Sequence, residues 1–153
     1  MDVISLRPIS ISDTDLIVKW RNTDAVRLNM YDQRIITAEQ HQYYYHSYIE
    51  RGIISQYIIE VSNNAIGTIY YKKIDNLSAE IGLFIGEEGF YGQGIGKKVL
   101  NKLLSVIEKQ GFKKVILKVK RDNCRALSLY LHSGFVIEDN NHSFIMMSRI
   151  IGD

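Results

Sequence analysis

The chain has 153 residues, of which 46% are hydrophobic and 24% charged, and this composition is typical of one folded domain, 1–153, rather than of a disordered chain. Its formal net charge of +2 is too small to indicate a nucleic-acid-binding protein. Cys124 is the only cysteine, so we expect no intrachain disulfide. No apolar run approaches the roughly 18 residues of a membrane span, and no basic leader precedes an apolar stretch. We therefore expect a cytoplasmic protein without membrane contact.

The N-terminal third is predicted to form one strand and two helices. Apolar and polar residues alternate over Val3–Ile9, which indicates an edge strand. Ser12 or Asp13 is suited to cap the helix that follows. A second helix is expected over Thr37–Arg51, because Thr37 has a glutamine three residues later, at the spacing of a capping box.

Three strands joined by two turns come next. Segments rich in Ile, Tyr and Val predict strands at Ser55–Val61, Ala65–Ile74 and Ser78–Ile85. Asn63-Asn64 and Asp75-Asn76 lie between these strands and are residues that tight turns favour. We therefore expect three consecutive strands connected as hairpins.

The second half of the chain alternates helices and strands. Apolar residues spaced for one helical face predict a helix over Gly94–Gln110. A buried strand at Lys114–Lys120 and a helix at Arg125–Ser133 follow, and two last strands are expected at Phe135–Ile137 and Ser143–Ile150. The order β-α-α-β-β-β-α-β-α-β-β predicts an α/β fold around a mixed sheet.

A glycine-rich turn, Tyr91-Gly92-Gln93-Gly94-Ile95-Gly96-Lys97-Lys98, precedes the long helix. Glycines let the backbone approach a ligand closely, and the first amides of a helix have no internal partner, so this turn is suited to bind phosphate. On the glycines alone, a flexible turn without a ligand is the alternative. A Walker loop is excluded because Lys98 stands where it needs Ser or Thr, and a dinucleotide fingerprint is excluded because the pattern is GxGxG.

Two motifs together resemble the GNAT acetyltransferase superfamily. The glycine-rich turn stands in the place of that family's [RQ]-x-x-G-x-[GA] loop, with Tyr91 at the position of Arg or Gln. Further along, Asn123, Ala126, Tyr130 and Gly134-Phe135 match the family's N-x-x-A-x-x-x-Y-x-x-x-G-F segment. The resemblance implies a splayed mixed sheet of about seven strands flanked by about four helices, with acetyl-coenzyme A as co-substrate.

The same resemblance places the co-substrate in a gap between the strands Glu80–Ile85 and Lys114–Lys120. The pantetheine arm is then expected to hydrogen-bond the backbone of Leu83, Phe84 and Ile85 in the manner of a missing strand. The remaining expected cofactor contacts are the pyrophosphate-binding residues Gln93, Gly94, Ile95, Gly96 and Lys97, together with Asn123, which contacts pantetheine, caps the following helix, or does both.

The resemblance also implies the two catalytic groups. A tyrosine at the position of Tyr130 protonates the leaving thiolate, and a carboxylate at the position of Glu80 is the general base, commonly through water. Without the resemblance, the alternative for Tyr130 is a helix residue that packs under the sheet. The alternative for Glu80 is a strand residue that is exposed to solvent or forms a salt bridge. Cys124 has no evident histidine partner that would activate it as a nucleophile. We therefore expect the acetyl group to pass directly from coenzyme A to the amine, without a covalent acetyl-enzyme. No metal site is indicated, because His41 and His46 have the wrong spacing for one helical face.

The acceptor pocket is expected in the N-terminal third, with Trp20, Arg21, Met30, Tyr31 and His41 as candidate residues. These motifs resemble N-acetyltransferases of the pseudaminic-acid pathway, which acetylate the 4-amino group of a nucleotide-linked deoxy-amino sugar. Aromatic rings can stack on a base or sugar, and an arginine can meet a diphosphate. For most of these residues individually, packing of helices onto the sheet is the alternative. The expected partner is a small-molecule amine.

Two other functions stay open. Strings such as Trp20-Arg21-Asn22 also occur in ribosomal-protein N-terminal acetyltransferases, and an acyl-coenzyme A sensor needs neither Glu80 nor Tyr130. An amine with a pKa near 8 is roughly 10% neutral at pH 7, and a lysine with a pKa of about 10.4 is far less so. A sugar amine or a protein α-amine is therefore favoured over lysine. The oligomeric state, including a homodimer, stays open.

Overall fold

The computed structural model describes residues 3–140 and 142–152, so both ends of the expected domain 1–153 lie outside the described residues. Seven strands form one mixed sheet in the order β1-β2-β3-β4-β5-β7-β6, which confirms the expected fold class. The strands are β1 (Ile4–Pro8), β2 (Ile54–Val61), β3 (Asn64–Lys73), β4 (Ser78–Ile85), β5 (Lys114–Lys120), β6 (Val136–Asp139) and β7 (Phe144–Ile150). The helices are α1 (Thr14–Arg21), α2 (Asp24–Arg27), α3 (Ala38–Tyr44), α4 (Ile95–Lys109) and α5 (Cys124–His132).

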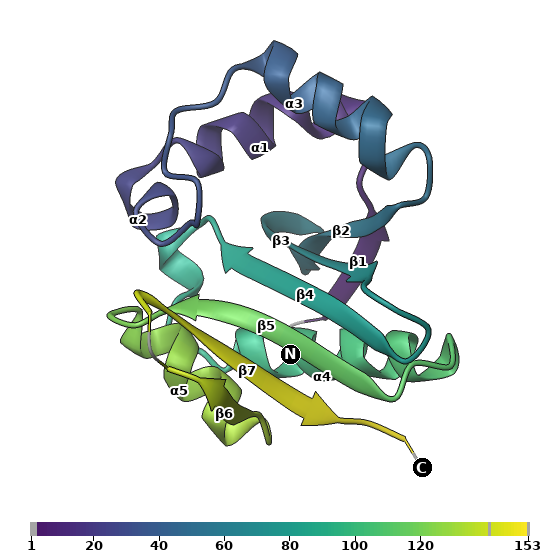
Figure 1. The fold of residues 1–153 in the computed structure, drawn as a ribbon. Coiled ribbons are helices and arrows are strands. Elements are labelled where there is room, and N and C mark those ends of the chain that lie inside the picture. Colours follow the sequence, from purple (N-terminus) through teal and green to yellow (C-terminus); the bar gives the residue numbers. More distant parts are fainter. Residues whose placement is uncertain (1–2, 141, 153) are drawn as a thin grey trace.

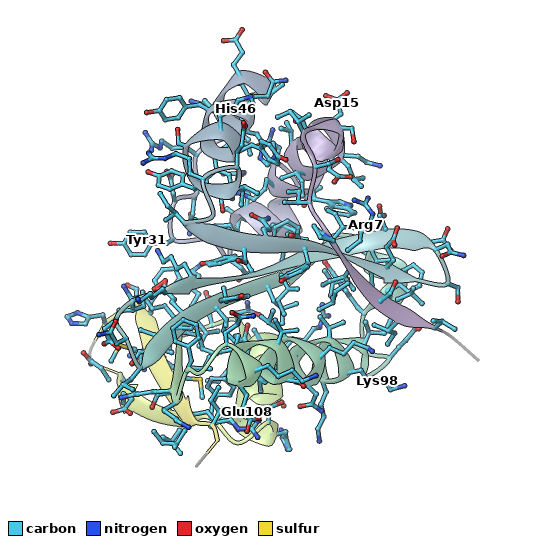
Figure 2. All side chains as sticks on the ribbon, turned by 90° about the vertical axis from the view of Figure 1, so that its right-hand side faces the viewer. Arg7, Asp15, Tyr31, His46, Lys98 and Glu108 are labelled. Atoms are coloured by element: carbon cyan, nitrogen blue, oxygen red, sulfur yellow. The ribbon has the colours of Figure 1, made fainter. Side chains whose placement is uncertain are left out.

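The sheet lies between two layers of helices, as Figures 1 and 2 show. Helices α4 and α5 cover one face, over a large apolar core. Helices α1 and α3 cover the other face around a smaller cluster that contains Ile17, Trp20 and Ile58. In Figure 1, α1 and α3 lie over β2 to β4, and β5 and β7 extend beyond them. Within the described residues, no helix is long and apolar enough to cross a membrane.

Helix α4 is fixed to the sheet by its apolar face. The six residues that the sequence assigns to this face are at most 6% exposed: Ile95, Val99, Leu100, Leu103, Leu104 and Ile107. Burial of each such side chain stabilises the fold by about 1.5–3 kcal/mol. The periodicity therefore locates the helix within about one residue at each end and holds its N-terminus just beyond β4.

Strands β4 and β5 pair only at their beginnings. They run parallel, and the pairing covers Ser78–Glu80 with Lys114–Ile116. Beyond it β4 continues beside β3 as far as Ile85, and β5 continues beside β7 as far as Lys120. Each half of the sheet follows its own neighbour and its own twist, so the two strands diverge. The splayed sheet expected from the sequence is confirmed.

Helix α2 is absent from the sequence-based prediction. It is a single turn over Asp24–Arg27, and Thr23 Oγ1 accepts a hydrogen bond from the Val26 amide at 3.4 Å. One turn is too short to show a helical period in the apolar residues. The predicted helix over Thr37–Arg51 is confirmed at its start, where Thr37 and Gln40 form the capping box, but it ends in a π-helical turn over Tyr45–Ile49.

Two other local predictions are wrong in detail. The Asp13 carboxylate does not cap α1, because it accepts hydrogen bonds from Arg7 Nη1 and Nη2 at 2.9 and 2.8 Å and from the Ser10 amide at 2.8 Å. The first hairpin turns at Ser62 and Asn63, which have φ values of 49° and 71°, so that Asn64 begins β3. A two-residue turn of type I′ requires positive φ at both central positions, a conformation that Asn tolerates. The second turn is confirmed: Asp75 Oδ1 accepts from the amides of Leu77 and Ser78.

Candidate functional site

Glu80 lies where β4 and β5 part. It is the last β4 residue paired with β5, opposite Ile116. Its side chain is 18% exposed, and one carboxylate oxygen lies 3.7 Å from Lys72 Nζ. Since Ala79 and Ile81 point into the core under α4 and α5, alternation along the strand puts Glu80 on the face that α1 and α3 cover. A carboxylate is therefore held at the opening between the strands.

Tyr70 stands beside this carboxylate, and the sequence analysis missed it. It pairs with Gly82 across β3 and β4, and its ring lies over that glycine. A Cβ atom at Gly82 would be 2.7 Å from Tyr70 Cζ and 2.8 Å from its Oη, so only glycine leaves room for the ring. Burial, and the nearby Glu80 carboxylate to a smaller extent, raise the pKa of Tyr70 to about 12. Counting residues outward from the Asp75-Asn76 turn would have found this pair.

Tyr130 approaches the same opening from the opposite face of the sheet. It belongs to α5, is 5% exposed, and packs edge-to-face on Phe135 with ring centroids 5.7 Å apart. Burial, followed by the proximity of Tyr70, raises the pKa of Tyr130 above its ordinary value. Its hydroxyl has no hydrogen-bond partner among the described residues. A protonated, unpaired donor thus faces the region where Tyr70 and Glu80 lie.

The glycine-rich turn leaves the start of α4 open. Gly92 and Gly94 have φ values of 73° and 74°, and a Cβ added at either would meet nothing within 4 Å. No side chain of the described residues caps α4. The amides of Ile95, Gly96 and Lys97 are therefore the unpaired first amides of a helix, which is the geometry of an anion site. The predicted backbone arrangement is present.

Other residues of the turn have structural contacts of their own. Gln93 Nε2 donates to the Gly89 carbonyl at 2.8 Å. A Cβ at Gly96 would lie 3.1 Å from Leu129 Cδ2, so this glycine also lets α4 approach α5. Tyr91, where the family motif has Arg or Gln, donates its hydroxyl to the Ile85 carbonyl at 3.1 Å and lies 4.2 Å from the Arg125 guanidinium carbon. Tyr91 thus ties the turn to the end of β4.

The expected pantetheine contacts lie along the free edge of β4. Leu83, Phe84 and Ile85 are paired with β3, and no β5 residue pairs with them in the described structure. The Ile85 carbonyl accepts the Tyr91 hydroxyl, and the other backbone groups on this edge would suit an extended ligand. Asn123 accepts a hydrogen bond from the Ala126 amide at 3.4 Å and so caps α5. Its capping role is confirmed, and its contact with pantetheine remains a prediction.

The five predicted acceptor residues differ in environment, because Trp20 and His41 are buried and Tyr31 is exposed. Trp20 is 1% exposed, donates to Glu87 Oε1 at 3.0 Å, and lies against Gly86 in the smaller core. His41 is 4% exposed, with an unpartnered buried Nε2, and burial lowers its pKa. Met30 is half-buried, and the neighbouring Tyr31 is exposed. Trp20 and His41 have the environment of core residues, and their acceptor roles remain predictions.

Arg21 is half-buried at the end of α1. Its Nη1 is buried without a hydrogen-bond partner among the described residues, and burial lowers the pKa of its guanidinium. Asp32 and Tyr44 are the neighbours that favour its charge. A guanidinium nitrogen in this state has capacity for an anionic or carbonyl oxygen.

A groove of about 1060 Å³ lies on the part of the sheet beyond α1 and α3. Tyr31 is 81% exposed, projects to one side of the molecule in Figure 2, and lies over Phe144 with ring centroids 5.4 Å apart. Lys120 Nζ donates to the Leu28 carbonyl at 3.0 Å and so joins the loop before Tyr31 to β5. The lining of the groove includes the basic side chains Lys118, Lys120 and Arg121, the acidic Asp122 and Asp139, and the apolar or aromatic Tyr31, Phe144 and Met146.

The groove and Glu80 share one face of the sheet. Lys118 follows Ile116, the partner of Glu80, by two residues, and alternate residues of a strand point to the same face. It lies farther along β5 in the direction in which β4 and β5 diverge. A molecule in the groove could therefore extend toward the carboxylate. Among the described residues, no group of three or more His, Cys, Asp or Glu side chains is arranged to hold a metal ion.

Comparison with known proteins identifies the family to which the chain belongs. A family model described as an acetyltransferase (GNAT) domain matches residues 4–136. An uncharacterized protein of Methanocaldococcus jannaschii is 26% identical over 136 residues, which cover 86% of this chain and 28% of that protein. A mycothiol acetyltransferase of Beutenbergia cavernae is 33% identical over 70 residues, covering 46% of this chain and 24% of that protein. The chain spans about a quarter of the length of these curated relatives.

Solved structures share the fold. A domain from Methanocaldococcus jannaschii superposes with a TM-score of 0.89 at 21% identity, over 99% of this chain and all of that one. A spermidine N-acetyltransferase of Vibrio cholerae, in complex with coenzyme A and spermine, superposes with a TM-score of 0.85 at 20% identity, over 96% of this chain and 95% of that one. A ribosomal L7/L12 α-N-protein acetyltransferase in complex with coenzyme A superposes with a TM-score of 0.83 at 22% identity, over 97% of this chain and 94% of that one. At these low sequence identities, the similarity shows a shared fold and nothing further.

Proposed function

The chain belongs to the GNAT acetyltransferase family, and we propose that it transfers the acetyl group of acetyl-coenzyme A directly to a primary amine. The observation that carries the proposal is the position of Glu80 and Tyr130 on opposite faces of the sheet, with Tyr70 near both, where β4 and β5 diverge. We also propose that residues 1–153 act as one domain, because a single sheet joins the first strand to the last.

The residues present fit the co-substrate. The amides of Ile95, Gly96 and Lys97 offer unpaired donors for a diphosphate, and the exposed Lys97 and Lys98 add positive charge. The free edge of β4 offers backbone groups to the pantetheine amides over Leu83–Ile85. Acetyl-coenzyme A supplies the activated acetyl group when it is bound, and the chain's own residues hold and protonate the reacting atoms.

Proton transfer is assigned to two side chains. Glu80, directly or through water, accepts the proton that the amine loses as its nitrogen bonds to the acetyl carbon. Tyr130 donates its hydroxyl proton to sulfur as the carbon–sulfur bond breaks. Reference pKa values near 10 for tyrosine and about 8.5 for a thiol make this second transfer unfavourable by roughly 2 kcal/mol in water. Burial raises the pKa of the thiol as it raises that of Tyr130, so the two shifts offset each other.

For the acceptor, we propose a nucleotide-linked amino sugar whose nucleotide lies in the groove. Tyr31 offers an exposed aromatic face to a base, and Lys118, which has no ion-pair partner among the described residues, offers charge to phosphate. Arg21 Nη1 is a further donor for an anionic oxygen.

A protein N-terminus is the second candidate acceptor. The groove is open along the sheet, which also suits an extended peptide, and an α-amine is more often neutral at pH 7 than a lysine amine. A sensor that only binds the thioester is disfavoured, because it would not need Glu80 and Tyr130 at one opening. A cytoplasmic location remains a prediction from the sequence, which leaves the oligomeric state open.

A thiol-release assay tests the proposal. Acetyl-coenzyme A is offered with four acceptors: a uridine-diphosphate-linked 4-amino sugar, an N-terminal peptide, spermidine and an aminoglycoside. We expect the fastest release with the nucleotide sugar. Release with the peptide alone would move the assignment to protein N-termini. Absence of release with every acceptor would contradict the proposed activity.

A further inference from the structure

We propose that the Tyr70 hydroxyl binds the attacking amine and passes its proton toward Glu80, an inference that rests on the proposed function. Tyr70 is placed for this by β3, which is not part of either sequence motif. The role is distinct from that of Tyr130, which lies on the other face of the sheet and serves the leaving sulfur.

The position of the hydroxyl is fixed by Gly82. Because the Tyr70 ring crosses above that glycine, its Oη lies over the backbone of β4, two residues past the point where β5 stops pairing. Glu80 precedes Gly82 by two residues on the same face of β4. An amine that enters from the groove side and reaches the free edge of β4 therefore meets Tyr70 and Glu80 together.

The unpaired state of the hydroxyl argues for a ligand. Tyr70 is half-buried, and its hydroxyl has no hydrogen-bond partner among the described residues. Its neighbours on the same face are bonded: Tyr44 donates to Gln56 at 3.0 Å, and Gln56 donates to Thr68 at 2.9 Å. The Tyr70 oxygen is not one of the fully buried unpartnered atoms of the described residues, so it is open to solvent or to a ligand, and phenylalanine would pack over Gly82 equally well. Packing therefore explains the ring of Tyr70 but not its oxygen.

The proton balance is simple. The amine donates one N–H to Tyr70 Oη, which leaves the nitrogen lone pair for the acetyl carbon. As the nitrogen–carbon bond forms, that proton moves to Tyr70 while the original Tyr70 proton moves to Glu80, directly or through one water. Tyr70 is a neutral phenol before and after, which agrees with its high pKa, and Glu80 ends protonated.

Tyr70→Phe removes only the oxygen and tests the inference. With the best acceptor of the four-member panel, we expect kcat/KM for the acceptor to fall about 10- to 100-fold, the range of one hydrogen bond to a reacting polar group. The KM for acetyl-coenzyme A should stay unchanged. Tyr71→Phe is the matched control, because Tyr71 is the next residue of β3, points to the opposite face and packs on Phe112.

A double-mutant cycle separates a proton path from packing. If Tyr70 and Glu80 act on one proton, Tyr70→Phe should add less than its full effect in the Glu80→Gln background. Wild-type rates in Tyr70→Phe, or fully additive effects in the cycle, would overturn the inference while leaving the proposed function intact. Absence of thiol release by the wild-type protein with all four acceptors would overturn both.

Discussion

The cofactor side and the acceptor side of the cleft are built from different parts of the polypeptide. On the cofactor side, the candidate contacts are backbone groups: the first amides of α4 and the free edge of β4. On the acceptor side they are side chains from separate elements, among them Arg21 of α1, Tyr70 of β3 and Tyr31 of a loop. A backbone site requires glycines and a helix start close together in sequence. A side-chain site can be assembled from residues far apart in the chain.

The largest expected effect lies where the two sides meet. Tyr130→Phe should lower kcat about 100- to 10,000-fold, the range for loss of a general acid. Stability and coenzyme A affinity should change little, because the lost hydroxyl bonds to no described residue. Steady-state thiol release and thermal unfolding check this, with the exposed Tyr43→Phe as control. Undiminished turnover would remove Tyr130 from the chemistry.

The next effect concerns stability on the acceptor side. The Arg7 guanidinium holds the pKa of Asp13 below its ordinary value, so Asp13 contributes stability that is present above about pH 4 and is lost as pH falls through its folded-state pKa. Asp13→Asn should cost about 1–2 kcal/mol at pH 7, less than a fully buried pair because Arg7 is partly exposed.

Urea unfolding from pH 7 to pH 2 measures that difference. It should shrink toward zero as the wild-type Asp13 becomes protonated. Asp15→Asn, an exposed position in the first turn of α1, is the control. A difference that is constant with pH would mean that the ion pair is not its source. The KM for acetyl-coenzyme A at pH 7 should not respond to either change, since both residues lie on the acceptor side.

A smaller effect is expected on the cofactor side. Gly94→Ala places a side chain at a φ of 74°, which costs about 1–2 kcal/mol of strain, although nothing lies within 4 Å of the added Cβ. Relief of that strain would turn the helix amides, so the KM for acetyl-coenzyme A should rise several-fold while the acceptor KM stays constant. Gly89→Ala, where φ is not positive and space is equally open, is the control. Equal KM values in both variants would contradict a backbone anion site.

The smallest effect is expected at Tyr31. Tyr31→Ala should raise the acceptor KM about 3- to 10-fold through loss of one aromatic stacking contact. Because Tyr31 is 81% exposed, the melting temperature should hardly move. Tyr43→Ala, 73% exposed on α3, controls for loss of a surface tyrosine. An unchanged acceptor KM with Tyr31→Ala would exclude the groove from acceptor binding.

The same contrast explains what the sequence could predict. Helix α4, the turn before it and the Asn123–Phe135 segment are local patterns with strong periodicity or fixed spacing, and the structure has them within a residue or two. Single-turn α2 and the Arg7–Asp13 pair depend on tertiary contacts and were missed or misread. The motif places Trp20 in the acceptor pocket but does not show that its indole fills the space left by Gly86. Strand pairing decides on which face of the sheet a side chain lies, and a short sequence motif does not contain that information.

The central claim is that the amides at the start of α4 bind the diphosphate of coenzyme A while the free edge of β4 binds its pantetheine arm. Amide NMR spectra recorded during titration with coenzyme A, and separately with pantetheine, test both parts at once. We expect coenzyme A to shift the resonances of Ile95, Gly96 and Lys97 together with those of Leu83–Ile85. Pantetheine, which lacks the diphosphate, should shift only the β4 set. Saturating coenzyme A that leaves the amides of Ile95–Lys97 unmoved would contradict the account.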